Sequence, residues 1–60
     1  MLPKRYKMYT QYADGVSKQE NNNDIVPLLD TAAIYLRDES CIICTIQDTI
    51  TGKIVLDVRR

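Results

Sequence analysis

Apolar residues recur at helical spacing in the middle of the chain, and no other segment has so clear a period. Asp24 precedes this run and suits an N-cap, and Pro27 falls in the first turn, where a proline is tolerated. The pattern therefore predicts a helix over residues 24–38. Its apolar stripe is Ile25, Leu28, Leu29, Ala32, Ala33 and Leu36.

The segments before and after this helix have the composition of β-strands. Residues 4–12 are rich in aromatic and β-branched types and alternate in character, as do residues 53–59, and residues 41–47 form an apolar, β-branched run. Gly52 lies between the last two segments and suits a hairpin loop. Alternation assigns these side chains to the inward face: Tyr6, Met8, Thr10, Tyr12, Ile42, Cys44, Ile46, Ile54, Leu56 and Val58.

Residues 13–23 are polar and begin with the turn signal Ala-Asp-Gly, so they are predicted to be a loop. The resulting order, β-α-β-β, predicts an α+β fold in which one α-helix packs on a three-stranded antiparallel sheet. In the alternative fold, residues 33–37 form a strand and the chain is a mostly-β meander.

The chain has 60 residues, which allows one small domain over residues 1–60. A core of this size gives marginal stability, and self-association is an economical way to bury more surface. The eight basic and eight acidic residues cancel, so no overall attraction to nucleic acid or membranes is expected. No apolar run could span a bilayer, and the start lacks the apolar region of a secretory signal, so a complete cytoplasmic protein is expected.

Catalysis is not expected. The sequence contains no His, which excludes Ser-His and Cys-His catalysis and imidazole metal sites. So short a chain also cannot enclose a substrate pocket and keep a core. We therefore expect no enzyme activity, no catalytic residue, no metal ligand and no cofactor.

The two cysteines form a Cys41-Ile-Ile-Cys44 motif, a spacing found in redox and zinc sites. Three steps along a strand cover roughly 10 Å and place the two side chains on opposite faces, which is incompatible with a disulfide. We therefore expect Cys44 to be buried in the core and Cys41 to lie on the outer face.

The outer sheet face is the predicted working surface. If the first and last strands are neighbours, basic residues gather there beside a tyrosine. Tyr9, Cys41, Ile43 and Val55 are expected to form an apolar centre with a charged rim, as at a protein interface. The predicted partner-binding residues are Arg5, Lys7, Tyr9, Ile43, Val55 and Arg59.

These features predict a small, non-catalytic protein-binding module that regulates or inhibits a larger protein and forms a homodimer. Compact proteins of this kind are common products of phages and mobile elements, so such an origin is one hypothesis. The alternative is a small nucleic-acid-binding protein that uses the basic, tyrosine-containing sheet face.

Overall fold

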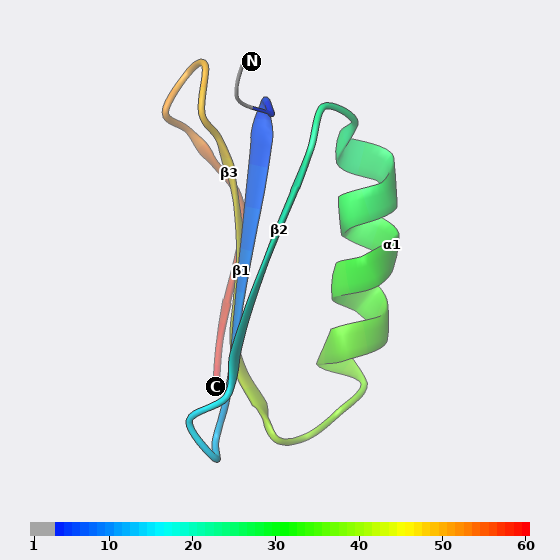
Figure 1. Ribbon diagram of the computed structural model, residues 1–60. Helices are drawn as coiled ribbons and strands as arrows, with labels where there is room; N and C mark the ends of the chain where they lie inside the picture. The colour runs from blue at the N-terminus through cyan, green and yellow to red at the C-terminus, as the bar shows by residue number, and fades with distance from the viewer. Residues whose placement is uncertain (1–3) are drawn as a thin grey trace.

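A computed structural model describes residues 4–60 and shows one helix packed on one face of a four-stranded sheet (Figure 1). All neighbouring strands are antiparallel, in the order β2-β1-β3-β4. The predicted α+β class and the helix are confirmed, and the alternative meander is wrong. The elements are β1 (Tyr6–Tyr12), β2 (Ser17–Asn22), α1 (Ile25–Leu36), β3 (Cys41–Asp48) and β4 (Ile54–Arg59).

The predicted sheet lacked one strand, because residues 13–23 are a turn followed by strand β2. Gly15 has a φ of 92°, a left-handed conformation that favours glycine. The Val16 N–H donates to Asp14 Oδ1 at 3.0 Å, and the Tyr12 N–H donates to the Val16 carbonyl at 2.8 Å. These bonds fold the chain back as a hairpin. β2 is an edge strand held by pairing with β1, so it forms without alternating apolar residues.

Helix α1 begins and ends at residues that satisfy its free backbone groups. Asp24 Oδ1 accepts the Val26 N–H at 3.0 Å, which confirms the predicted N-cap. At the other end, the Arg60 guanidinium donates to the Leu36 carbonyl at 2.7 Å and to the Asp38 carbonyl at 3.3 Å. The last residue of the chain thereby stabilises the end of the helix.

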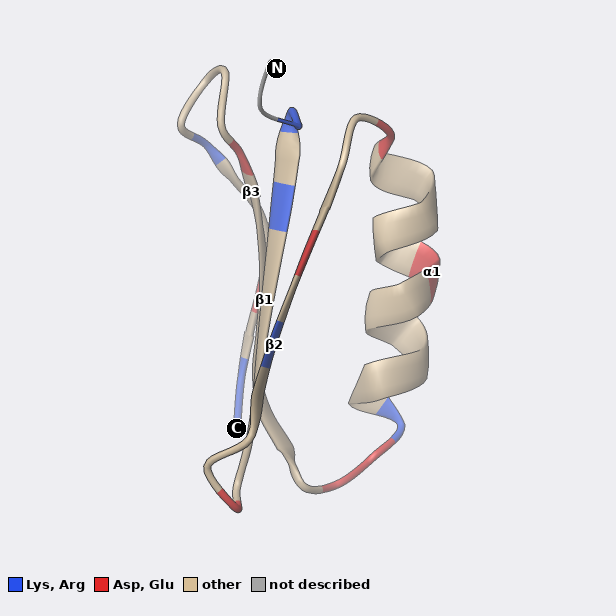
Figure 2. Ribbon diagram, viewed as in Figure 1, with Lys and Arg blue, Asp and Glu red and all other residues tan. Residues whose placement is uncertain are grey.

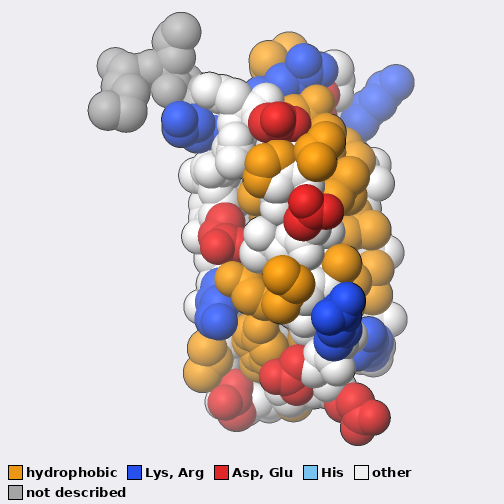
Figure 3. Space-filling view, turned by 90° about the vertical axis from the view of Figure 1, so that its right-hand side faces the viewer, with side chains coloured by type: hydrophobic (Ala, Val, Ile, Leu, Met, Phe, Trp, Pro, Cys, Tyr) orange, Lys and Arg blue, Asp and Glu red, His pale blue; other side chains and the backbone are white. Residues whose placement is uncertain are grey.

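The core lies between α1 and the sheet, where α1 packs over β2 and β3. The apolar stripe of α1 is narrower than predicted: Leu29 and Ala33 are exposed, and Val26 and Ile34 extend the uncovered apolar surface. Figure 3 shows apolar side chains running along this outer side of the molecule. The buried apolar residues are Met8, Leu28, Ala32, Cys41, Cys44 and Ile46.

Two irregularities in strand register correct the predicted faces. The β1–β3 register shifts at Gln11/Tyr12, so Tyr12 pairs with Cys41, and Cys41 is buried rather than on the outer face. The β3–β4 register shifts at Ile46/Gln47, so Ile54 pairs with Gln47 instead of pointing inward. A β-bulge sets two residues against one and breaks strict alternation at that point.

Candidate functional site

The sheet face opposite α1 is not covered by any element of residues 4–60 (Figure 1). We call it the open face. Strand registers place its side chains in three rows that each cross all four strands. Tyr9 lies in the middle row of this grid. The rows are Asn21-Lys7-Gln47-Ile54, Gln19-Tyr9-Thr45-Asp57 and Ser17-Gln11-Ile43-Arg59.

A hollow of about 420 Å³ lies on the open face beside Tyr9. Tyr9, which is 37% exposed, and Ile54 provide its apolar walls. Lys7 adds one positive charge, and the Gln47 amide donates to the Gly52 carbonyl at 3.3 Å. The hollow therefore combines an aromatic surface with several hydrogen-bonding groups. Its lining is Lys7, Tyr9, Gln19, Thr45, Gln47 and Ile54.

The structure brings several predicted binding residues to the open face but does not gather them into one apolar centre. Lys7 and Tyr9 line the hollow, whereas Ile43 lies in the third row. Val55 is 47% exposed next to the bulge of β4. Cys41 is missing from this face because it is buried. The face is thus a tyrosine surrounded by amides and hydroxyls, with apolar residues on the β3–β4 side.

Arg5 lies before β1, and its side chain stabilises the fold. Its Nη2 donates to Asp48 Oδ2 at 3.0 Å, and Asp48 is buried at the end of β3. Asp48 Oδ1 also accepts the Ile50 N–H at 3.0 Å and so holds the β3–β4 turn. The hydrogen bond from Arg5 is the main cause that lowers the pKa of Asp48 below its ordinary value. The guanidinium is therefore committed to Asp48 within this chain.

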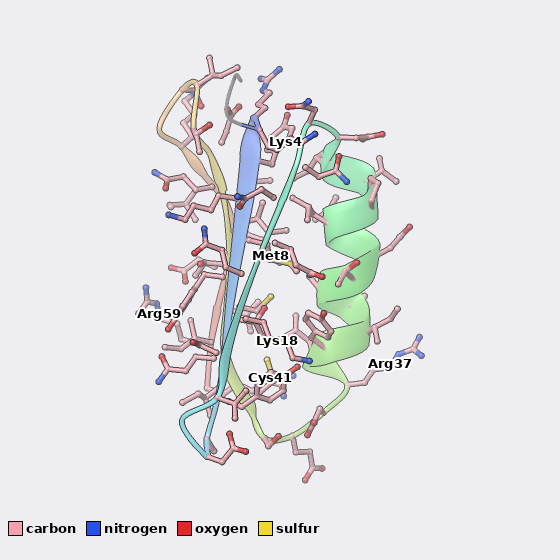
Figure 4. The ribbon with its side chains drawn as sticks, in the orientation of Figure 1. Lys4, Met8, Lys18, Arg37, Cys41 and Arg59 are labelled. Atoms are coloured by element: carbon pink, nitrogen blue, oxygen red, sulfur yellow. The ribbon has the colours of Figure 1, made fainter. Side chains whose placement is uncertain are left out.

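Basic residues do not form a single cluster (Figure 2). The condition for such a cluster, that the first and last strands are neighbours, is not met, because β3 lies between β1 and β4. Arg59 projects from the open face (Figure 4) and donates through Nε to Asp57 Oδ1 at 3.0 Å. Lys7 and Arg59 are the two cations in the three rows. Because Arg59 is paired with an acid, the Lys7 ammonium is the positive group beside the hollow.

Both cysteines lie in the core as free thiols. Figure 4 shows Cys41 and Met8 pointing from the sheet toward α1. Thr10 Oγ1 donates to the Cys44 sulfur at 3.9 Å, and burial is the main cause that raises the pKa of the Cys44 thiol. A buried thiol with a raised pKa is a poor nucleophile, so the Cys44 sulfur acts as a small apolar core group.

Four residues of the hollow were not among the predicted binding residues: Gln19, Thr45, Gln47 and Ile54. For Gln19 and Ile54 the predicted element or face was also wrong. Gln19 lies on β2, which was predicted to be a loop, and Ile54 was assigned to the core by simple alternation. The only signal for Gln19 was the Asp-Gly turn before it, which could have suggested a hairpin. No signal in the sequence marked the bulge that turns Ile54 outward.

Within residues 4–60, no group of three or more Cys, Asp or Glu side chains is placed to hold a metal ion. The helix in this part of the chain is too short to cross a membrane. Comparison with protein families, with characterised proteins and with solved structures found no match.

Proposed function

We propose that this protein is a small, non-catalytic binding module that regulates or inhibits a larger protein by docking its open face onto it. One observation carries the proposal: a partly exposed tyrosine at the centre of an uncovered sheet face, beside a hollow that could take a partner's side chain. Tyrosine is enriched among the residues that contribute most to binding, and these lie near the centre of an interface. The amides around Tyr9 supply adaptable hydrogen bonds, as in antibody paratopes.

The charges favour a protein partner over nucleic acid. Phosphate binding depends on several unpaired cations acting together. Here Arg5 is paired with Asp48 and Arg59 with Asp57, and the chain has no net charge. A single lysine beside an aromatic ring gives little affinity for a phosphate backbone but is well suited to the edge of a protein interface.

The test is affinity capture from the native host with matched variants, after nuclease treatment. Tyr9→Ala removes the central side chain of the open face, and Ile34→Ala is the control because it removes an exposed apolar side chain from the opposite side of the molecule. We expect wild type and Ile34→Ala to retain the same protein, and Tyr9→Ala to weaken its binding by at least about tenfold. Circular dichroism confirms that all three are folded.

Two outcomes would contradict the proposal. Loss of the partner with Ile34→Ala and not with Tyr9→Ala would assign binding to the outer side of α1. Release of all captured material by nuclease, with steep salt dependence and sensitivity to Lys7→Ala, would assign the open face to nucleic acid.

A further inference from the structure

Within residues 4–60, no strand pairs with the outer side of the edge strand β4, which leaves a row of its backbone groups unpaired at one side of the sheet. The Arg60 N–H donates to the Ile42 carbonyl at 2.8 Å, so the backbone of Arg60 faces β3. Backbone direction alternates along an antiparallel strand, so Val58 also faces β3 and the groups of Asp57 and Arg59 face away from the sheet. The free edge therefore offers two donors and two acceptors at these two residues.

We propose that β4 pairs with β4 of a second copy of this chain, antiparallel and centred on Val58, to join two sheets into one of eight strands. In this register Asp57 lies opposite Arg59 of the second copy, and Arg59 lies opposite its Asp57. Each of these two pairs exchanges two backbone hydrogen bonds, because both residues direct their groups outward. This interface goes beyond the proposed function and does not depend on it.

Charge complementarity selects this register. Backbone groups that point outward must oppose groups that also point outward, so the registers that fit are centred on a residue and not between two residues. Centring on Asp57 would oppose two aspartates, and centring on Leu56 would oppose Asp57 to Val55. In the register centred on Val58, both pairs bring an acidic and a basic side chain together. Such cross-strand pairs of opposite charge are stabilising.

The side chains on the helix side of β4 also favour pairing. Leu56 and Val58 pack against the core but are only half-buried, because α1 lies over β2 and β3 and leaves β4 at its flank. Pairing would place Val58 against Val58 of the second copy and bury part of this apolar surface.

The other edge strand, β2, is a weaker candidate for self-pairing. Its six side chains are all polar, so pairing would bury little apolar surface. The Asp57–Arg59 pair lies within β4 itself, whereas the charged residues of β2 contact Tyr35 on α1, on the helix side of the sheet. Lys18 Nζ lies 4.9 Å from the centre of the Tyr35 ring, and the Tyr35 hydroxyl donates to Glu20 Oε1 at 3.3 Å.

A dimer of this kind leaves the hollow free. The symmetry axis would run perpendicular to the sheet, so the two helices would lie on one side and the two open faces on the other. The hollow is lined by residues of the first two rows of the open face, and neither Asp57 nor Arg59, the residues of the paired edge, is part of its lining. The dimer would thus present two copies of the binding surface in one direction, which strengthens binding to a repeated or dimeric partner.

Charge reversal at the β4 edge tests the pairing by sedimentation equilibrium. In a dimer of Asp57→Arg, arginine would face arginine in both pairs, and in a dimer of Arg59→Asp, aspartate would face aspartate. Each variant alone should therefore self-associate at least about tenfold more weakly than wild type. An equimolar mixture of the two variants restores both attractive pairs and should form a one-to-one heterodimer. Arg37→Asp, which makes the same charge change at the end of α1, is the control and should dimerise like wild type.

The mixing result is the decisive one, because a loss of stability in either variant could not produce a restored heterodimer. Thermal unfolding of each variant shows separately that it is folded. A wild-type protein that stays at 6.9 kDa at concentrations of about 1 mM would overturn the inference. So would dimers that persist in both single variants, or a mixture of folded variants that stays monomeric.

Discussion

Asp48, at the end of β3, links the segment before β1 to the turn between β3 and β4. Its carboxylate accepts hydrogen bonds from the Arg5 guanidinium and from the Ile50 N–H, and the Thr49 N–H donates to the Arg5 carbonyl at 2.8 Å. The segment before β1 is thereby fixed to the β3–β4 turn, more than 40 residues away along the chain. A buried carboxylate with these partners is costly to remove, because the donors would lose their acceptor.

Replacing Asp48 with Asn should lower the melting temperature by several degrees at pH 7, since the ion pair with Arg5 is lost. The carboxylate has a lowered pKa in the folded state, so its contribution is complete above the unfolded value of about 3.9 and disappears as the pH falls through the folded pKa. The difference in melting temperature between wild type and Asp48→Asn should therefore shrink as the pH falls below about 4. Thermal unfolding from pH 7 to pH 2 measures it.

Asp30→Asn provides the control, because Asp30 is exposed on α1 and far from the Arg5 segment in the sequence. A gap between wild type and Asp48→Asn that stays constant down to pH 2 would show that the ion pair is not its source.

At the level of the elements, α1 depends on its N-cap. Asp24 satisfies a backbone N–H that would otherwise lack a partner, and the first turn has no acidic residue to supplement it. Asp24→Ala should reduce the free energy of unfolding by about 1 kcal/mol, whereas Asp30→Ala in the middle of the helix should change it by less than half as much. Urea denaturation followed by circular dichroism measures both. Equal effects of the two substitutions would argue against the cap.

The elements also show which features the sequence could reveal. The helix and strands β1, β3 and β4 were predictable, because apolar periodicity and turn residues mark them locally. β2 was not, because Ser17–Asn22 contains no apolar residue and its conformation depends on pairing with β1. Strand order was accessible only in part: Gly52 predicted the hairpin of β3 and β4, but nothing in the sequence indicated that β1 pairs with β3 and not with β4.

The candidate site was predictable only in part. Alternation correctly assigned Lys7 and Tyr9 to the outer face, because β1 is regular over these positions. It failed at Cys41 and Ile54, where register shifts move one side chain into the core and the other out of it. A bulge is a property of two paired strands, so one strand's sequence does not show it.

At the scale of the molecule, one apolar layer supports a particle of only 33 × 19 × 17 Å. A core this small leaves three surfaces that no other part of residues 4–60 covers: the open face, the β4 edge and the outer side of α1. In our account the open face binds another protein and the β4 edge binds a second copy. The outer side of α1, with Ile34 61% exposed, therefore serves as the internal comparison for any test of the open face.

Photo-crosslinking in the native host tests the central claim most directly, because it reports which face contacts a partner without relying on loss of binding. A photoreactive phenylalanine analogue is placed either at Gln19, on the rim of the hollow, or at Ile34, on the outer side of α1. Our account predicts one discrete protein adduct from position 19 and none from position 34. An adduct from position 34 alone, or an adduct from position 19 that nuclease destroys, would contradict it.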